Sequence, residues 1–172
     1  PKNKEFGFLE RAENACDRAH GLTSQLLTFA RGGQAEKCLT SLQDLIKESI
    51  DFILSGSNSK LVSEISTNLW PVEADPEQIR QVLSNLIINA TQAMPEGGVI
   101  KVSARNYVND DFDRLTLPEE HYVQIQIKDS GIGISEENLN RIFDPYFTTK
   151  KSGTGLGLAT SYSIVKNHGG TI

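Results

Sequence analysis

Residues 81–90 read Gln81-Val82-Leu83-Ser84-Asn85-Leu86-Ile87-Ile88-Asn89-Ala90, a largely apolar stretch with neutral amides at a four-residue spacing. Residues at i and i+4 lie on one face of a helix, so the stretch predicts a core helix that presents a row of amides, Gln81, Asn85 and Asn89, to its neighbour. A surface helix would normally carry Lys and Glu at such positions. Amide oxygens suit a hard cation that already carries anionic phosphates.

The composition is that of one domain of ordinary size with a real core. The chain has 172 residues, a hydrophobic share of 38% and a net charge of -5. The lack of a strong basic patch argues against nucleic acid as the main partner. We find no signal peptide and no apolar run near the ~20 residues of a membrane span, so we expect no membrane contact by this chain. Its two cysteines, Cys16 and Cys38, lack metal-ligand neighbours and read as reduced thiols of a cytoplasmic protein.

We expect the chain to be a fragment of a longer protein, because Pro1 is not Met and Thr171-Ile172 reads as the opening of a strand. Residues 6–31 form a first unit, in which apolar residues recur at steps of three and four. This period predicts an amphipathic helix that packs on a partner helix, and Gly32-Gly33 ends it. The partner is either a second copy or a helix outside this chain.

From about residue 37 the pattern becomes mixed. Alternating apolar and polar residues predict strands at 60–66, 70–74, 99–108 and 122–128. A period of three to four predicts helices at 42–54, 76–94, 136–143 and 156–167, and Asp75-Pro76 supplies an N-cap and first-turn proline for the second of them. Residues 109–120 and 144–154 read as loops. The order favours an α+β fold, a two-layer α/β sandwich with helices on one face.

Two glycine motifs follow the amide row. Asp129-Ser130-Gly131-Ile132-Gly133 comes directly after a strand, where a buried carboxylate can accept a hydrogen bond from the amine of adenine and glycines let the backbone approach a flat ligand. A plain turn is the alternative. Gly153-Thr154-Gly155-Leu156-Gly157-Leu158 opens a helix whose free N–H groups favour phosphate, although the pattern also fits a flexible linker.

Between these motifs lies a polar loop. The loop places hydroxyls and two cations just before the last helix, from Thr148, Thr149, Lys150, Lys151 and Ser152. It could close over a triphosphate, or it could be a solvated basic loop. Phe143 and its aromatic neighbours either anchor the base of this loop or pack in the core. Each motif has a simple explanation alone, but their order and conjunction predict a site for ATP with Mg²⁺.

The chain resembles the catalytic, ATP-binding domain of sensor histidine kinases, in the superfamily that also holds gyrase, the Hsp90 chaperones and MutL. The resemblance rests on four boxes in order: Asn85-Leu86-Ile87-Ile88-Asn89-Ala90 (N box), Asp129-Ser130-Gly131-Ile132-Gly133 (G1), Phe143-Asp144-Pro145-Tyr146-Phe147 (F) and Gly153-Thr154-Gly155-Leu156-Gly157 (G2). Residues 22–33 are similar to the second helix of the family's dimerisation hairpin. The expected domains are therefore 1–33, this partial hairpin, and 34–172, the catalytic domain.

The resemblance implies a role for each matching residue. Asn89 would ligate Mg²⁺, Asn85 would support the metal and phosphates, and Lys150 would contact phosphate; these three are the expected catalytic residues. Asp129 would read adenine, with Gly131 and Gly133 shaping its pocket. Gly153, Gly155 and Gly157 would form the phosphate cradle and the hinge of the loop, and the remaining cofactor contacts would be Phe143, Thr148, Thr149, Thr154 and Leu156.

The resemblance also implies the reaction. Hydrolytic members of the superfamily carry a Glu, as general base, at the position of Asn85, and an amide cannot take a proton from water at neutral pH. This favours transfer of the γ-phosphoryl group to a histidine on an upstream helix, followed by relay to an aspartate of a response-regulator receiver domain. We expect the intact protein to be a homodimer through the hairpin, and its membrane anchoring stays open. A hydrolytic ATPase and a non-catalytic binding module are the alternatives.

We expect none of the chain's three histidines to be the main acceptor. His20 lacks the acidic residue that follows an acceptor histidine in this family, since Gly21 stands there. His121 begins a strand, and His168 ends a helix, where its role is structural.

Overall fold

The computed structural model describes residues 35–54, 59–108, 121–150 and 153–172, with the side chains of 51–54 left out. The chain divides into two compact units, Pro1–Gln34 and Ala35–Ile172, and all described residues belong to the second. The helix expected at 6–31 and the loop expected at 109–120 lie outside the described residues.

Three strands make the main sheet. Strands β2 (Lys60–Ile65), β4 (Val99–Val108) and β5 (His121–Asp129) lie in the order β2-β4-β5. β4 is parallel to β2 and antiparallel to β5, with Ile100 opposite Asp129 and Val108 opposite His121. This register puts Asp129 at one end of the sheet and His121 at the other.

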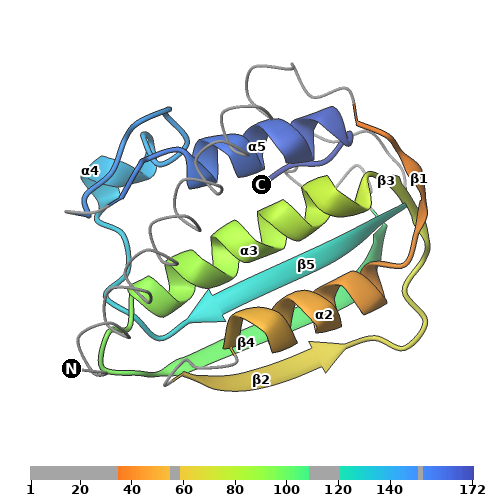
Figure 1. Ribbon diagram of the computed structural model, residues 1–172, viewed down its shortest axis with the longest axis horizontal. Coiled ribbons are helices and arrows are strands. Elements are labelled where there is room, and N and C mark those ends of the chain that lie inside the picture. Colours follow the sequence, from red (N-terminus) through yellow and green to blue (C-terminus); the bar gives the residue numbers. More distant parts are fainter. Residues whose placement is uncertain (1–34, 55–58, 109–120, 151–152) are drawn as a thin grey trace, which may run out of the picture. The chain divides into compact units, whose positions relative to one another are not determined.

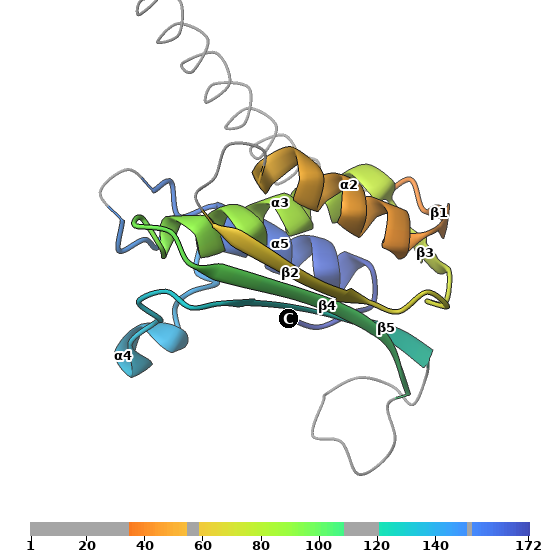
Figure 2. The same cartoon turned by 90° about the horizontal axis from the view of Figure 1, so that it is seen from below.

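Two short strands, β1 (Cys38–Thr40) and β3 (Val72–Ala74), pair antiparallel in a separate sheet. The helices are α2 (Leu42–Leu54), α3 (Pro76–Gln92), α4 (Glu136–Leu139) and α5 (Gly157–Asn167) (Figure 1). Figure 2 shows α2, α3 and α5 on one side of the main sheet, with α3 between the other two. The second unit is therefore a two-layer α/β sandwich, as the sequence predicts.

The core lies between these layers because β4 alternates as a half-buried strand should. Ile100, Val102 and Ala104 are buried under the helices. On the opposite face Lys101 pairs with Glu64 across 2.7 Å. The helical layer completes the core with Leu42, Leu45, Ile46, Ile50, Leu83, Ile87, Ala90 and Met94.

Most expected elements are confirmed, with three differences. The sequence prediction missed β1, and only Val72–Ala74 of the strand expected at 70–74 forms. The helix expected at 136–143 stops at Leu139, and bonds from the Arg141 and Asp144 amides to carbonyls three residues back continue the chain in tight turns. Pro145 disfavours helical backbone only at Asp144, the residue before it, so it limits how far these turns extend and does not explain the stop at Leu139.

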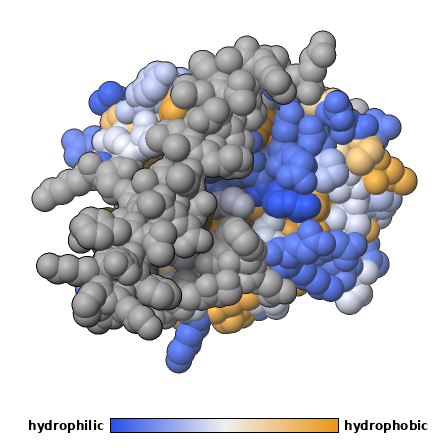
Figure 3. Space-filling model, in the orientation of Figure 1, coloured by the Kyte–Doolittle hydropathy of each residue, from blue (hydrophilic) through white to orange (hydrophobic). Residues whose placement is uncertain are grey.

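The surface of the second unit is mixed. In Figure 3 the coloured part of the face is mainly hydrophilic with small apolar areas. Among the described residues, no helix combines the length and apolarity that crossing a bilayer requires.

Candidate nucleotide-binding site

Helix α3 carries the amide row, and its ends and its buried face fix where the row points. The Asp75 carboxylate caps its start by accepting from the Glu77 and Gln78 amides at 3.0 and 3.2 Å. The helix then buries Val82, Leu83, Ile87 and Ala90. Asn85 and Asn89 lie beside this buried stripe and are half-buried. The helix therefore places both amides at the margin of the core, where a ligand can reach them.

Asn85 joins α3 to the start of α5. Its Nδ2 donates to the Gly157 carbonyl at 3.1 Å and to the Ser161 hydroxyl at 3.3 Å. Ser161 is fully buried and itself donates to the same carbonyl at 2.9 Å. The N box and the G2 box, 72 residues apart in sequence, are thus brought together by a direct hydrogen bond.

Asn89 contacts a cation. The Lys150 ammonium donates to Asn89 Oδ1 and to Gln92 Oε1, each at 2.7 Å. Burial lowers the pKa of Lys150 from the ordinary lysine value, because the charged form loses water there. The amide oxygen expected to bind Mg²⁺ therefore accepts from a cationic group, and neutral amide oxygens are of the donor type that Mg²⁺ uses.

Asp129 lies at the end of β5 and is exposed, so the expectation of a buried carboxylate is wrong. Its Oδ1 accepts from the Gly131 amide at 2.8 Å, a short turn made by its own loop. Gly131 passes close to the end of α3: an added Cβ would lie 2.6 Å from the Ala93 carbonyl oxygen. The next amide, Ile132, donates to that oxygen at 3.3 Å. A glycine is needed here because the turn packs directly on the helix backbone.

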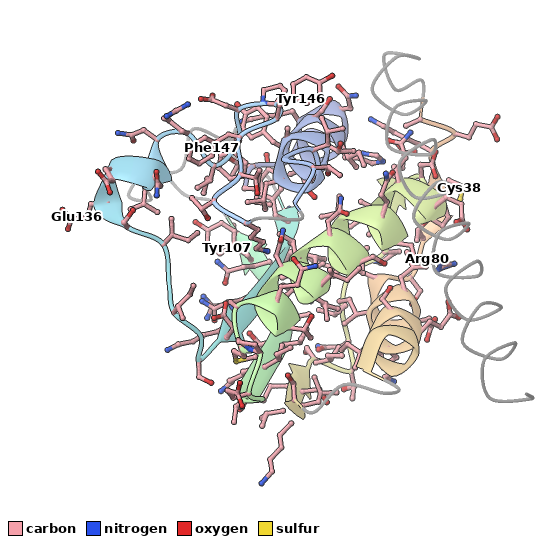
Figure 4. All side chains as sticks on the ribbon, turned by 60° about the vertical axis from the view of Figure 1, so that its left-hand side comes forward. Cys38, Arg80, Tyr107, Glu136, Tyr146 and Phe147 are labelled. Carbon is pink, nitrogen blue, oxygen red and sulfur yellow. The ribbon has the colours of Figure 1, made fainter. Side chains whose placement is uncertain are left out.

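Gly155 lies against the F box. Its φ is +69°, and an added Cβ would lie 2.6 Å from the Tyr146 carbonyl oxygen. The Tyr146 amide donates to the Gly155 carbonyl at 3.0 Å, and Tyr146 itself has a φ of +67°. Figure 4 shows Tyr146 and Phe147 on the loop between α4 and α5. The F and G2 boxes therefore meet backbone to backbone, and no side chain fits between them.

Aromatic side chains hold the base of this loop. The Phe143 ring lies 5.2 Å from that of Tyr162 on α5, and the Arg141 guanidinium lies 4.4 Å from the centre of the Phe147 ring. Phe143 thus packs against the helix that follows the loop, which supports the expectation that it anchors the loop.

The remaining expected residues line the loop and the start of α5. The Thr148 hydroxyl accepts from the Lys150 amide at 3.1 Å, and that of Thr154 from the Leu156 amide at 3.4 Å. Thr149, Gly153 and Gly133 are exposed, and Leu156 is buried. Lys151 and Ser152 lie outside the described residues. The threonine hydroxyls therefore shape the loop, and any contact with phosphate would be additional.

Gln92 and Ser161 contact predicted site residues, Lys150 and Asn85 respectively, but were not themselves predicted. Gln92 follows Asn89 by three residues on α3, so extending the amide row by one step at i+3 would have found it. Ser161 follows Gly157 by four residues on α5, and its role depends on which face of that helix meets Asn85. No sequence pattern reveals that contact.

A pocket of about 390 Å³ lies elsewhere, lined by Trp70, Pro71, Val72, His121, Tyr122 and Val123. His121 is at the opposite end of β5 from Asp129. The pocket is therefore separate from the amide row and the glycine motifs.

A helical layer on one face of a mixed sheet, with an amide-bearing helix facing a glycine-rich helix start, defines an ATPase-type nucleotide-binding domain. The chain belongs to the histidine kinase-, DNA gyrase B- and HSP90-like ATPase family, whose model matches residues 74–172, more than half of the chain.

Curated relatives are named as sensor kinases. The chain is 40% identical over 174 residues to the sensor kinase CckA of Brucella abortus (strain 2308), covering 97% of this chain and 18% of the relative. It is 37% identical over 160 residues to the sensor histidine kinase ZraS of Escherichia coli (strain K12), covering 91% and 32%. The chain thus spans no more than about a third of the length of these relatives.

Solved structures agree on the fold. The catalytic domain of histidine kinase ThkA superposes with a TM-score of 0.62 at 34% identity, covering 77% of this chain and 82% of that one. Full-length ShkA, solved in complex with AMPPNP, superposes with a TM-score of 0.70 at 22% identity, covering 93% and 33%.

Proposed function

We propose that this chain is the ATP-binding catalytic part of a sensor histidine kinase, which transfers the γ-phosphoryl group of Mg·ATP to a histidine on another helix of its parent protein. The observation that carries the proposal is the hydrogen bond from the Lys150 ammonium to the Asn89 side chain. A second amide on the same helix, Asn85, donates to the first residue of α5. Cation-binding amides and a glycine-rich helix start suit a metal-bound polyphosphate.

Each residue has a role in this proposal. Asn89 Oδ1 would hold the Mg²⁺, which when bound neutralises phosphate charge, and Lys150 would bind the phosphates directly. Asn85 orients the first turn of α5, whose N–H groups favour an anion. The Asp129 carboxylate is exposed and could accept from the adenine amine after the turn adjusts. Catalysis by this chain is then positioning and charge neutralisation, as is usual in phosphoryl transfer.

Asn85 favours transfer over hydrolysis. An amide cannot act as a general base, and its nitrogen is already committed to Gly157 and Ser161. The acceptor histidine would lie on the helical hairpin to which residues 1–33 are assigned, in a homodimer located in the cytoplasm. The phosphoryl group would then pass to an aspartate of a response-regulator receiver domain.

Transfer from γ-labelled ATP tests this proposal. The chain is mixed with Mg²⁺ and a longer version of its parent that carries the hairpin and Asn89→Ala, which removes the longer protein's own metal ligand. Acid-labile, base-stable label on the longer protein supports the kinase. Label found only as free phosphate would support a hydrolytic ATPase instead, and no use of ATP would leave a binding module.

A further inference from the structure

The Lys150 ammonium has two acceptors, and only one of them is the expected metal ligand. Asn89 Oδ1 and Gln92 Oε1 each lie 2.7 Å from Nζ. The two amides are three residues apart on α3, so they project from neighbouring positions on one helix face. Lys150 comes from a loop 58 residues further along the chain than Gln92. The contact therefore joins that loop to the end of the metal-binding helix.

Both acceptors are neutral, which decides what the contact can do. A hydrogen bond from an ammonium group is stronger than one between neutral groups, so two of them can offset the entropy lost by a long side chain. A carboxylate at position 92 would neutralise the lysine, whereas an amide leaves its charge available to an anion. Gln92 is thus suited to hold Lys150 in place without offsetting its positive charge.

Lys150 and a metal ion would compete for Asn89 Oδ1. The ammonium lies 2.7 Å from this oxygen, and two cations at one acceptor repel each other. A metal bound to Asn89 would therefore weaken the bond from Lys150 to this oxygen, while Gln92 can still accept from the lysine and keep it beside the α3 end of the site.

We propose that Gln92 is a positioning residue for Lys150, and that it holds the ammonium beside Asn89, the expected metal ligand. Without a metal, the held lysine interacts with bound phosphates. When a metal–nucleotide complex binds, Lys150 releases Asn89 and stays bonded to Gln92. This inference rests on the proposed nucleotide-binding function. It assigns a role to a residue outside the four boxes. It also predicts that the Lys150–Gln92 contact influences how strongly nucleotide binding depends on a metal.

The measurement is the affinity of the chain for the fluorescent nucleotide TNP-ATP, once in EDTA and once in saturating Mg²⁺. The quantity of interest is the metal-free Kd divided by the Mg²⁺ Kd. Gln92→Leu should raise this ratio about three- to tenfold, the size expected for losing one exposed charge-assisted hydrogen bond. It should do so because in EDTA the bound phosphates depend on the held lysine, whereas in Mg²⁺ the metal supplies the compensating charge.

Coupling distinguishes a positioning role from a merely structural one. Lys150→Met should also raise the ratio, and the double variant Gln92→Leu/Lys150→Met should match Lys150→Met alone, since Gln92 acts only through the lysine. Thr91→Ala is the matched control, because Thr91 lies next to Gln92 on α3 and bonds to its own helix, at the Ile88 carbonyl, at 2.8 Å. Its ratio should equal that of the unchanged chain.

Two results would overturn the inference. An unchanged ratio in Gln92→Leu, or effects of the two substitutions that simply add, would leave Gln92 without this role while the nucleotide-binding proposal stands. If the unchanged chain binds TNP-ATP in neither condition, the proposed function fails and this inference fails with it.

Discussion

The side-chain nitrogen of Asn85 donates to the carbonyl oxygen of Gly157 across 3.1 Å, and this bond ties the middle of α3 to the first residue of α5. The buried Ser161 hydroxyl shares the same carbonyl at 2.9 Å. Two boxes that look independent in the sequence are thus one structural unit, and the direction of the α5 N-terminus depends on a side chain of α3.

Replacing Asn85 with Ala should therefore loosen the start of α5. We expect a loss of about 1 kcal/mol in the free energy of unfolding, because one hydrogen bond is lost while Ser161 still satisfies the Gly157 carbonyl. Urea unfolding measures this loss, and faster hydrogen exchange in the first turns of α5 would locate it. Asn140→Ala, at an exposed asparagine after α4, should change stability by less than about 0.5 kcal/mol. Equal effects of the two changes would contradict the role given to Asn85.

Gly155→Ala should lower the free energy of unfolding more than an alanine substitution at another glycine of similar positive φ. A Cβ at Gly155 would overlap the Tyr146 backbone, so we expect a loss above about 2 kcal/mol. Gly169 is the control: its φ is +75°, but nothing lies within 4 Å of an added Cβ, so only the left-handed strain of about 1–2 kcal/mol applies. Thermal unfolding compares the two variants. Similar melting temperatures would show that the F box and G2 box do not constrain each other.

Asp129→Asn should weaken nucleotide binding without unfolding the turn. The asparagine oxygen can still accept from the Gly131 amide, but the anionic acceptor proposed for the adenine amine is lost. We expect ATP to bind about tenfold more weakly, the effect of roughly one charged hydrogen bond, with little change for GTP. Displacement of TNP-ATP by each nucleotide measures both affinities. Glu136→Gln, on the exposed face of α4, is the control, and a matching loss there would argue against adenine recognition by Asp129.

His168 should matter for stability and not for phosphoryl transfer. Its Nε2 accepts from the Asp75 amide at 3.0 Å, and its Nδ1 lies 2.8 Å from the Ile164 carbonyl, so both ring nitrogens are engaged and α5 is joined to the cap of α3. His168→Ala should lower the free energy of unfolding by about 1–2 kcal/mol, because the part-buried Asp75 amide loses its acceptor. Urea unfolding against Asn140→Ala, at an exposed position, tests this. Phosphate mapped to His168 by mass spectrometry after the transfer reaction would refute the structural role.

Much of the fold follows from local pattern. The i, i+4 amides, the Asp75-Pro76 cap and the alternation in β4 each specify their element because a helix or strand exposes one periodic face. The prediction was wrong where a local rule is weak. Three residues are too few to show alternation in β1, and the helix that begins at Glu136 stops at Leu139 although the apolar spacing continues to Phe143. The exposure of Asp129 also escaped prediction, because burial depends on what packs against the end of β5.

The sequence alone determined most of the described elements, the family resemblance and the choice of candidate site residues, because these depend on residue type and spacing. The tertiary structure alone decided which of those residues meet: Asn85 with Gly157, Lys150 with Asn89, and Gly155 with Tyr146. It also brought in Gln92, which lies one step beyond the predicted amide row, and Ser161, which no motif marks. The physical reason is that such contacts join residues 9 to 72 positions apart, and only the packing of helices on one sheet sets the distance between them.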